Sequence, residues 1–439
     1  MRLAPSAFVC VWLGVVCGAA TASAQTSSPA HKHVVQDPAA AALNQLLASA
    51  QEALNKEDFE TAAQDYQEYL AKKPDDAIAH FQLGYAYTGM KKPEEAKAEY
   101  EKAIELDPEM QAAYLNLGLT LLDTDAAAAV EPLEKAAKLK PEEPRPKFLL
   151  GWAFERTGKL PQAAEQYQAA EKLDAKNFNI SFALARTLLT MNRPAEAEPE
   201  FRAAIALRSD SAPAHLGLAQ SLLAEKKLDA AESEMAAYLT AQPNDTEMRI
   251  DHASVLVDLA KYSEAIAELD KVDAASSGGI RVLKLRSDAY FEMKRYADAI
   301  PLLEKAATVA PKDPEIPARL GHLYLENKDY PNAIKELGVA LKMDPSSTDV
   351  LADLVGAEYL SKNYAATLQG IDLLSQRKPL PIGSIFVRAT CYDRLGQKEL
   401  ALDSYKKFLE LNKDETSDMY FEASGRARTL AREILEKKR

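Results

Sequence analysis

The chain has 439 residues, of which 47% are hydrophobic and 27% are charged, so it can bury an extensive core and does not have the composition of a disordered chain. Its formal net charge of -13 argues against nucleic acid and anionic membrane surfaces as partners, because both attract Lys and Arg. Only 7% of the residues are aromatic and alanine is abundant, which favours helices.

The N-terminus has the features of an export signal. Arg2 provides a positive charge, residues 7–20 are apolar, and small residues at 22–24 match a signal-peptidase site. We therefore expect a signal peptide over residues 1–24 and a bacterial protein that is periplasmic or extracellular. A retained anchor is the alternative, but the apolar run is short for a membrane span. A lipoprotein is disfavoured because no small residue precedes Cys17. No later stretch is long and apolar enough to predict a span in the mature chain.

Residues 25–42 run from polar residues to alanines and predict a flexible linker. The pair His31 and His33 offers metal ligands, but a solvated linker is the favoured interpretation. Cys391 is the only cysteine beyond the predicted signal, so no internal disulfide is expected. We expect this lone thiol to be buried as a small hydrophobic group.

From residue 43 the sequence repeats with a period of 34. Residues 77–107 and 314–344 both place Leu-Gly before an aromatic residue, then a polar turn, a phased alanine and a closing Asp. Prolines keep the same period, with one residue missing between Pro108 and Pro141. They stand at Pro74, Pro108, Pro141, Pro243, Pro311, Pro345 and Pro379.

The sharpest signal is an alanine in the second half of each repeat, followed four residues later by a large apolar residue. Thr367 is the one exception to the alanine series. The alanines are Ala62, Ala96, Ala129, Ala163, Ala197, Ala231, Ala265, Ala299, Ala333 and Ala401. The large residues are Tyr66, Tyr100, Leu133, Tyr167, Phe201, Met235, Leu269, Leu303, Leu337, Ile371 and Tyr405.

This spacing predicts two helices in each repeat, with apolar positions three and four residues apart. The small residues let the paired helices approach closely, and the large residues fill the space between hairpins. Proline or a polar turn ends the second helix because proline clashes with a continuing helix. Since one hairpin cannot bury its own apolar face, neighbouring hairpins must stack.

The motif resembles the tetratricopeptide repeat family over residues 43 to about 413. The resemblance implies an all-α, right-handed superhelical solenoid of about eleven tetratricopeptide helical hairpins. The expected units are 43–76, 77–110, 111–143, 144–177, 178–211, 212–245, 246–279, 280–313, 314–347, 348–381 and 382–413.

Two features lie outside the regular pattern. Residues 414–439 predict a C-terminal capping helix that covers the end of the stack, with a basic docking tail as the alternative. The Ser-Ser-Gly-Gly run at 276–279 predicts either a hinge or an ordinary turn.

The sequence shows no established catalytic, phosphate-binding or metal-binding motif, so we expect no catalytic residue, cofactor or metal. His80 and His215 occupy the same position of their repeats, which favours a packing role. The acidic pairs, such as Glu94 and Glu95, stand at helix starts, where they suit the helix dipole. An enzyme with an unrecognised site is therefore a remote alternative.

In tetratricopeptide proteins the first helices line a concave groove, and positions five and nine of each unit point inward. Transferred by register, this implies a largely apolar and aromatic groove bordered by arginines. The candidate partner-binding residues are Phe81, Tyr85, Leu115, Leu119, Arg145, Phe148, Trp152, Arg156, Phe182 and Arg186. Some relatives clamp a terminal carboxylate with Lys and Asn, but those slots differ here.

We therefore expect a non-catalytic scaffold of the bacterial cell envelope that binds a protein or peptide, with the arginines pairing with acidic groups of the ligand. An alternative role is a periplasmic carrier or chaperone that shields apolar peptides. The structural alternative is that the aromatic side chains pack against adjacent helices or are covered by the linker.

Overall fold

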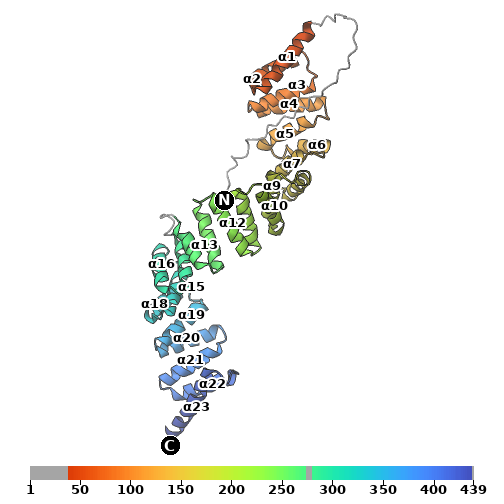
Figure 1. Ribbon diagram of the computed structural model, residues 1–439. Coiled ribbons are helices and arrows are strands. Elements are labelled where there is room, and N and C mark those ends of the chain that lie inside the picture. The colour runs from red at the N-terminus through yellow and green to blue at the C-terminus, as the bar shows by residue number, and fades with distance from the viewer. Residues whose placement is uncertain (1–37, 273–278, 438–439) are drawn as a thin grey trace. The chain divides into compact units, whose positions relative to one another are not determined.

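The computed structural model describes residues 38–272 and 279–437. The predicted signal peptide and residues 25–37 of the predicted linker lie outside the described residues. Within them, all regular secondary structure is helical and comprises 23 helices (Figure 1). Eleven consecutive helix pairs are followed by one final helix, which confirms the predicted all-α stack of hairpins.

The first helices of the hairpins are the odd-numbered ones. They are α1 (Pro38–Asn55), α3 (Ala77–Gly89), α5 (Gln111–Thr124), α7 (Pro144–Arg156), α9 (Phe178–Thr190), α11 (Ala212–Ala224), α13 (Thr246–Asp258), α15 (Ile280–Glu292), α17 (Glu315–Glu326), α19 (Thr348–Leu360) and α21 (Ile382–Arg394).

The second helices are even-numbered. They are α2 (Phe59–Leu70), α4 (Pro93–Leu106), α6 (Val130–Leu139), α8 (Leu160–Glu171), α10 (Pro194–Leu207), α12 (Leu228–Ala241), α14 (Tyr262–Asp270), α16 (Tyr296–Val309), α18 (Tyr330–Met343), α20 (Tyr364–Arg377) and α22 (Lys398–Leu411). The final helix is α23 (Asp418–Lys437).

One boundary differs from the expectation. Helix α1 begins at Pro38. The predicted linker over 25–42 is therefore wrong for residues 38–42, which belong to this helix. Proline is favoured in the first turn of a helix, and the four alanines after it have high helix propensity. The described residues form two compact units that divide between residues 116 and 117. Most of the Ser/Gly run at 276–279 lies outside the described residues, and each unit is considered by itself below.

The phased alanines lie in the core of the stack. All ten are 0% exposed, and the large residues four positions later are at most 2% exposed. Several glycines of the first helices lie directly against these large side chains, namely Gly84, Gly118, Gly151, Gly217 and Gly321. A Cβ atom on Gly84 would lie 2.8 Å from the Tyr100 ring, and one on Gly151 would lie 2.7 Å from the Tyr167 ring. The close approach of the paired helices therefore requires a small residue on one helix opposite a large apolar side chain on the other.

The tenth hairpin reverses this arrangement. Its first helix carries Val355 where other repeats have a small residue, and its second helix carries Gly370. A Cβ atom on Gly370 would lie 2.4 Å from the Val355 Cγ2 atom, so the small residue has moved to the opposite helix. Thr367, at the phased alanine position, is fully buried and donates its hydroxyl to the Asn363 carbonyl oxygen at 3.1 Å. The irregular repeat thus keeps the same close packing.

The turn inside most hairpins contains one residue in the left-handed region. The φ angles lie between 57° and 74°, which costs a non-glycine residue about 1–2 kcal/mol. These turn residues are Glu57, Lys91, Gly158, Asn192, Lys226, Ala260, Lys294, Lys328, Lys362 and Gly396. The shorter third hairpin turns instead through Asp125, whose carboxylate accepts from the backbone N–H groups of Ala127 and Ala128 at 3.1 Å.

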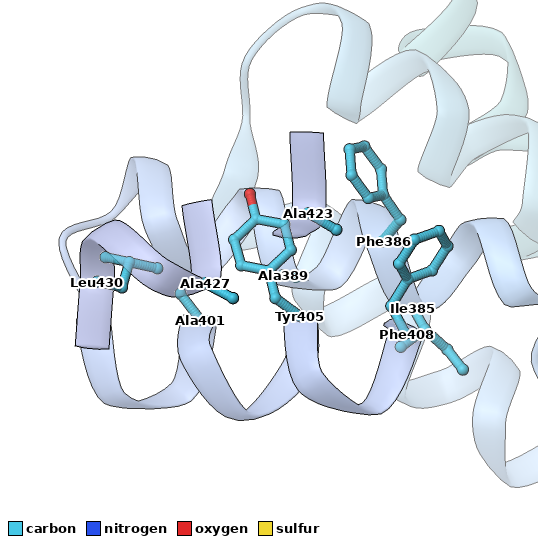
Figure 2. Packing of buried hydrophobic residues seen from close by; sticks show 9 residues of the cluster. All are labelled: Ile385, Phe386, Ala389, Ala401, Tyr405, Phe408, Ala423, Ala427 and Leu430. Atoms are coloured by element: carbon cyan, nitrogen blue, oxygen red, sulfur yellow. The ribbon is translucent and has the colours of Figure 1, made fainter. Parts of the chain in front are cut away.

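Helix α23 covers the apolar side of the last hairpin, as Figure 2 shows. Its Ala423, Ala427 and Leu430 are buried in a cluster that includes the Phe386 and Phe408 rings, whose centroids are 5.3 Å apart. Arg426 adds a bidentate pair, donating to the two Asp393 oxygens at 2.8 and 2.7 Å. One cation of the predicted basic tail therefore fixes the capping helix to α21.

Candidate functional site

We call the surface carried by the odd-numbered helices the first-helix face. In the second unit, Phe148 and Trp152 of α7 and Phe182 of α9 are half-buried. The Phe148 ring lies 5.6 Å from that of Tyr167, and Phe182 stacks on Phe178 at 5.5 Å and meets Phe201 at 6.0 Å. The Phe148 and Phe182 rings therefore pack on their own hairpins, and all three predicted aromatic residues keep part of their apolar surface in water.

The predicted arginines of this part have carboxylate partners within the protein. Arg186 pairs with Glu155 at 2.7 Å, and Glu155 also accepts from the Tyr167 hydroxyl at 2.9 Å. Arg156 lies 3.5 Å from Asp123. Arg145 is exposed near the start of α7. An acidic ligand group would therefore have to compete with Glu155 and Asp123 for Arg186 and Arg156.

The remaining predicted residues divide between the two units. In the first unit, Phe81 contacts Tyr100 with ring centroids 5.9 Å apart, and Tyr85 contacts Phe59 at 6.3 Å. Leu115 is buried in the same unit, and Leu119 is half-buried in the second. Phe81, Tyr85, Phe148 and Phe182 are thus partly used in packing within their own units.

Ion pairs join successive first helices of the second unit. Arg186–Glu155 links α9 with α7, Arg281–Asp251 links α15 with α13, and Arg319–Asp288 links α17 with α15. His322 Nδ1 then lies 3.0 Å from Asp353 on α19, and the hydrogen bond with that carboxylate raises the pKa of His322. Burial raises the pKa of Asp288, against the opposing effect of Arg319.

Helix α11 interrupts this series because it contains no Asp, Glu, Lys or Arg. A pocket of about 350 Å³ opens beside it, between α11, α12, α13 and α15. Its lining is mainly apolar, with one carboxylate and one guanidinium. The lining residues are Leu216, Ala219, Gln220, Leu223, Met235, Met248, Asp251, Ser254, Val255 and Arg281. The sequence prediction missed this pocket, although the uncharged first helix was a signal for it.

His80 and His215, which occupy the same position of their repeats, make the same pair of polar contacts. His215 Nδ1 lies 2.6 Å from Glu234, and its Nε2 atom lies 3.1 Å from the Ser209 carbonyl oxygen. His80 makes the same pair of contacts, with Glu99 at 2.6 Å and Pro74 at 3.0 Å. Each ring ties its hairpin to the turn that precedes it. We call this arrangement the staple.

Arg249 forms a third staple. It donates to Glu268 at 2.6 Å and to the Pro243 carbonyl oxygen at 2.5 Å. The histidines were predicted to pack, and the structure shows that they do so through polar contacts. Arg249 makes the equivalent contacts in its own repeat. The sequence prediction did not find the staple because the position alternates between residue types.

Within the described residues, no group of three or more His, Cys, Asp or Glu side chains is arranged to hold a metal ion. Cys391 is fully buried, as predicted, and burial raises the pKa of its thiol to about 11. A thiol with such a pKa is a poor nucleophile near neutral pH. In the part of the chain that the structure describes, no helix combines the length and apolar character required to span a membrane.

A search of curated proteins gives no match. Solved structures similar to this chain include YrrB, whose title describes a TPR protein with an unusual peptide-binding site. The two sequences are 21% identical, and the match covers 43% of this chain and 97% of YrrB with a TM-score of 0.40. MamA from Desulfovibrio magneticus RS-1 has 21% identity, coverages of 38% and 96%, and a TM-score of 0.37. PilF from Pseudomonas aeruginosa has 18% identity, coverages of 48% and 97%, and a TM-score of 0.38.

Family models described as tetratricopeptide repeat match along the chain. One model matches residues 47–89, 123–178, 182–246 and 250–314, which together exceed half of the sequence. Two others with the same description match residues 290–347, and residues 77–110 and 382–415. The fold and these matches support a protein–protein interaction scaffold. The chain belongs to the tetratricopeptide repeat family.

Proposed function

We propose that this protein is an exported, non-catalytic scaffold that binds a peptide or protein partner on the first-helix face of its second unit. The observation that carries the proposal is the half-buried state of Phe148, Trp152 and Phe182 on neighbouring first helices. Exposed apolar surface of this kind is typical of interaction sites. The N-terminal charge, apolar run and small-residue site support export to the bacterial periplasm or beyond.

Completing the burial of one such ring contributes roughly 1 kcal/mol, about half of the value for a fully transferred side chain. Three rings together then account for roughly a hundredfold in affinity. A segment lying across α7 and α9 contacts all three, and it does not require a free arginine. This size of effect is large enough to measure by mutation.

The test is a cross-linked pull-down from the cell envelope with the full chain and with a Phe148→Leu, Trp152→Leu, Phe182→Leu variant. Leucine keeps part of the packing on Tyr167 and Phe201 and removes the aromatic surface. We expect a small set of proteins to co-purify with the wild type and to be lost with the variant. Purified partner and protein should then bind each other with an affinity at least about tenfold weaker for the variant.

The control variant is Phe421→Leu, which removes an aromatic ring that is 65% exposed on α23 and distant in sequence from the proposed site. Circular dichroism must give equal helix content for all three proteins. Partners that persist in the triple variant would contradict the proposed face. Broad and weak capture of many unfolded chains would instead indicate the carrier or chaperone role.

A further inference from the structure

The pocket beside α11 is separate from the aromatic residues of the proposed site. Its lining includes Met235, which is 2% exposed, and the half-buried Met248 and Leu216. Methionine side chains are flexible and polarizable, so they adapt to apolar groups of different shapes. A volume of about 350 Å³ accommodates an aromatic side chain or two aliphatic ones.

Charges at the rim of the pocket are unequal. Arg281 is the one cation of the lining, and it faces two carboxylates, Asp251 at 2.5 Å and Glu247 at 3.9 Å. Helix α11 supplies four lining residues and no charge. Asp251 in the lining and Glu247 beside it thus share one guanidinium, and their side chains remain 46% and 69% exposed, so an incoming cation can reach either carboxylate.

We infer that this pocket is a subsite for a large apolar side chain flanked by Lys or Arg in a peptide segment of the partner. The apolar side chain fills the space above Met235 and Met248, and the flanking cation pairs with Asp251 or Glu247. An acidic flank would instead meet an arginine that already has two carboxylate partners. This inference rests on the proposed scaffold function and specifies the chemistry of one part of the partner.

The experiment uses the full chain labelled with ¹³C at the methionine methyl groups, with Met235 and Met248 assigned by Met→Leu variants. The probes are short capped peptides in a Gly-Ser frame, with the core Lys-Phe-Lys, Glu-Phe-Glu or Lys-Ala-Lys. We expect Lys-Phe-Lys to shift the signals of Met235 and Met248 and to bind at least about fivefold more tightly than the other two. The preference over Glu-Phe-Glu should fall at high salt.

Two variants separate a local site from general attraction to an acidic protein. Asp251→Asn should reduce the preference for Lys-Phe-Lys over Glu-Phe-Glu, whereas Asp353→Asn, which removes the same charge outside the pocket, should not. Ser254→Phe fills the pocket without changing charge and should abolish the methionine shifts. Equal effects of the two Asp variants, or unchanged shifts with Ser254→Phe, would overturn the inference.

Failure of the subsite and failure of the proposed function give different results. The Phe148→Leu, Trp152→Leu, Phe182→Leu variant leaves the pocket residues intact and should bind Lys-Phe-Lys as the wild type does. Methionine shifts in that variant therefore support the subsite even when its pull-down is empty. Absence of any shift in the wild type overturns the subsite and leaves the aromatic face to be judged by its own test.

Discussion

Glu200 occupies the staple position of the fifth hairpin without the staple's cation. The equivalent carboxylates Glu99, Glu234 and Glu268 are paired with His80, His215 and Arg249. In the fifth hairpin the corresponding first-helix residue is Ser181, which donates to Glu171 at 2.7 Å. Burial, together with the charge and the hydrogen bond of Glu171, raises the pKa of Glu200 to about 7.

This shift predicts a stability that falls with rising pH. The pKa of Glu200 is about 7 in the folded state, against an ordinary value of 4.5. The folded state therefore binds the proton more tightly, and its stability decreases as pH rises from about 4.5 to about 7. We expect Glu200→Gln to raise the urea midpoint at pH 8 and to have little effect at pH 4.5.

The matched change Glu234→Gln removes the partner of His215 and should lower the midpoint, because the paired histidine loses a charged acceptor. A Glu200→Gln variant that is less stable than the wild type at pH 8 would contradict the assignment. Ser181→His offers a complementary test. If the histidine forms the staple with Glu200, the pH dependence between 4.5 and 7 should weaken.

At the scale of helices, the contact between glycine and ring predicts that Gly→Ala lowers the free energy of unfolding at one position and raises it at another. Gly151→Ala would place a Cβ atom 2.7 Å from the Tyr167 ring, which is 1% exposed and has no room to move. We expect a loss of about 1–3 kcal/mol in the free energy of unfolding. Gly338→Ala lies in α18 with no atom within 4 Å of the added Cβ atom, and it should gain about 0.5–1 kcal/mol. Urea denaturation of both variants measures the difference, and two losses of equal size would argue against the steric explanation.

Much of this element-level structure follows from the sequence alone. The phased alanines and their large partners predicted the hairpins because their packing depends on residue size, which the sequence states directly. The staple was not predictable in this way, because His80, Arg249 and Ser181 differ in chemistry at one structural position. The left-handed turns escaped detection because residues other than glycine, lysine above all, occupy most of them.

The candidate site was less predictable than the fold. The register identified Phe148, Trp152 and Phe182, but it left open whether their rings meet a partner or pack on adjacent helices. In the structure the Phe148 and Phe182 rings both pack within their hairpins and keep part of their surface exposed. Carboxylate partners for Arg156 and Arg186 come from neighbouring repeats, about one period away in sequence. The pocket depends on Met235 of a second helix, whereas the prediction considered first helices only.

At the scale of the whole molecule, the end of the stack depends on α23. A chain that ends at Lys413 lacks Ala423, Ala427 and Leu430 and exposes the apolar side of the last hairpin, including Phe408. Terminal repeats require a cap to remain soluble. We therefore expect this truncated chain to self-associate and to melt at a lower temperature, as measured by light scattering and circular dichroism. A chain that ends at Lys437 is the control, and equal behaviour of the two would show that α23 is dispensable for solubility.

The left-handed turns place lysine residues where trypsin can cleave the chain once per repeat in several hairpins. Lys226, Lys294, Lys328 and Lys362 are exposed and stand at multiples of 34 residues, each in the short turn of a hairpin. Trypsin cleaves after lysine, and short exposed turns are nicked before the helices that flank them. Brief digestion should therefore produce a ladder of fragments whose lengths differ by whole repeats, so the periodicity hidden in a varied sequence would appear as evenly spaced bands.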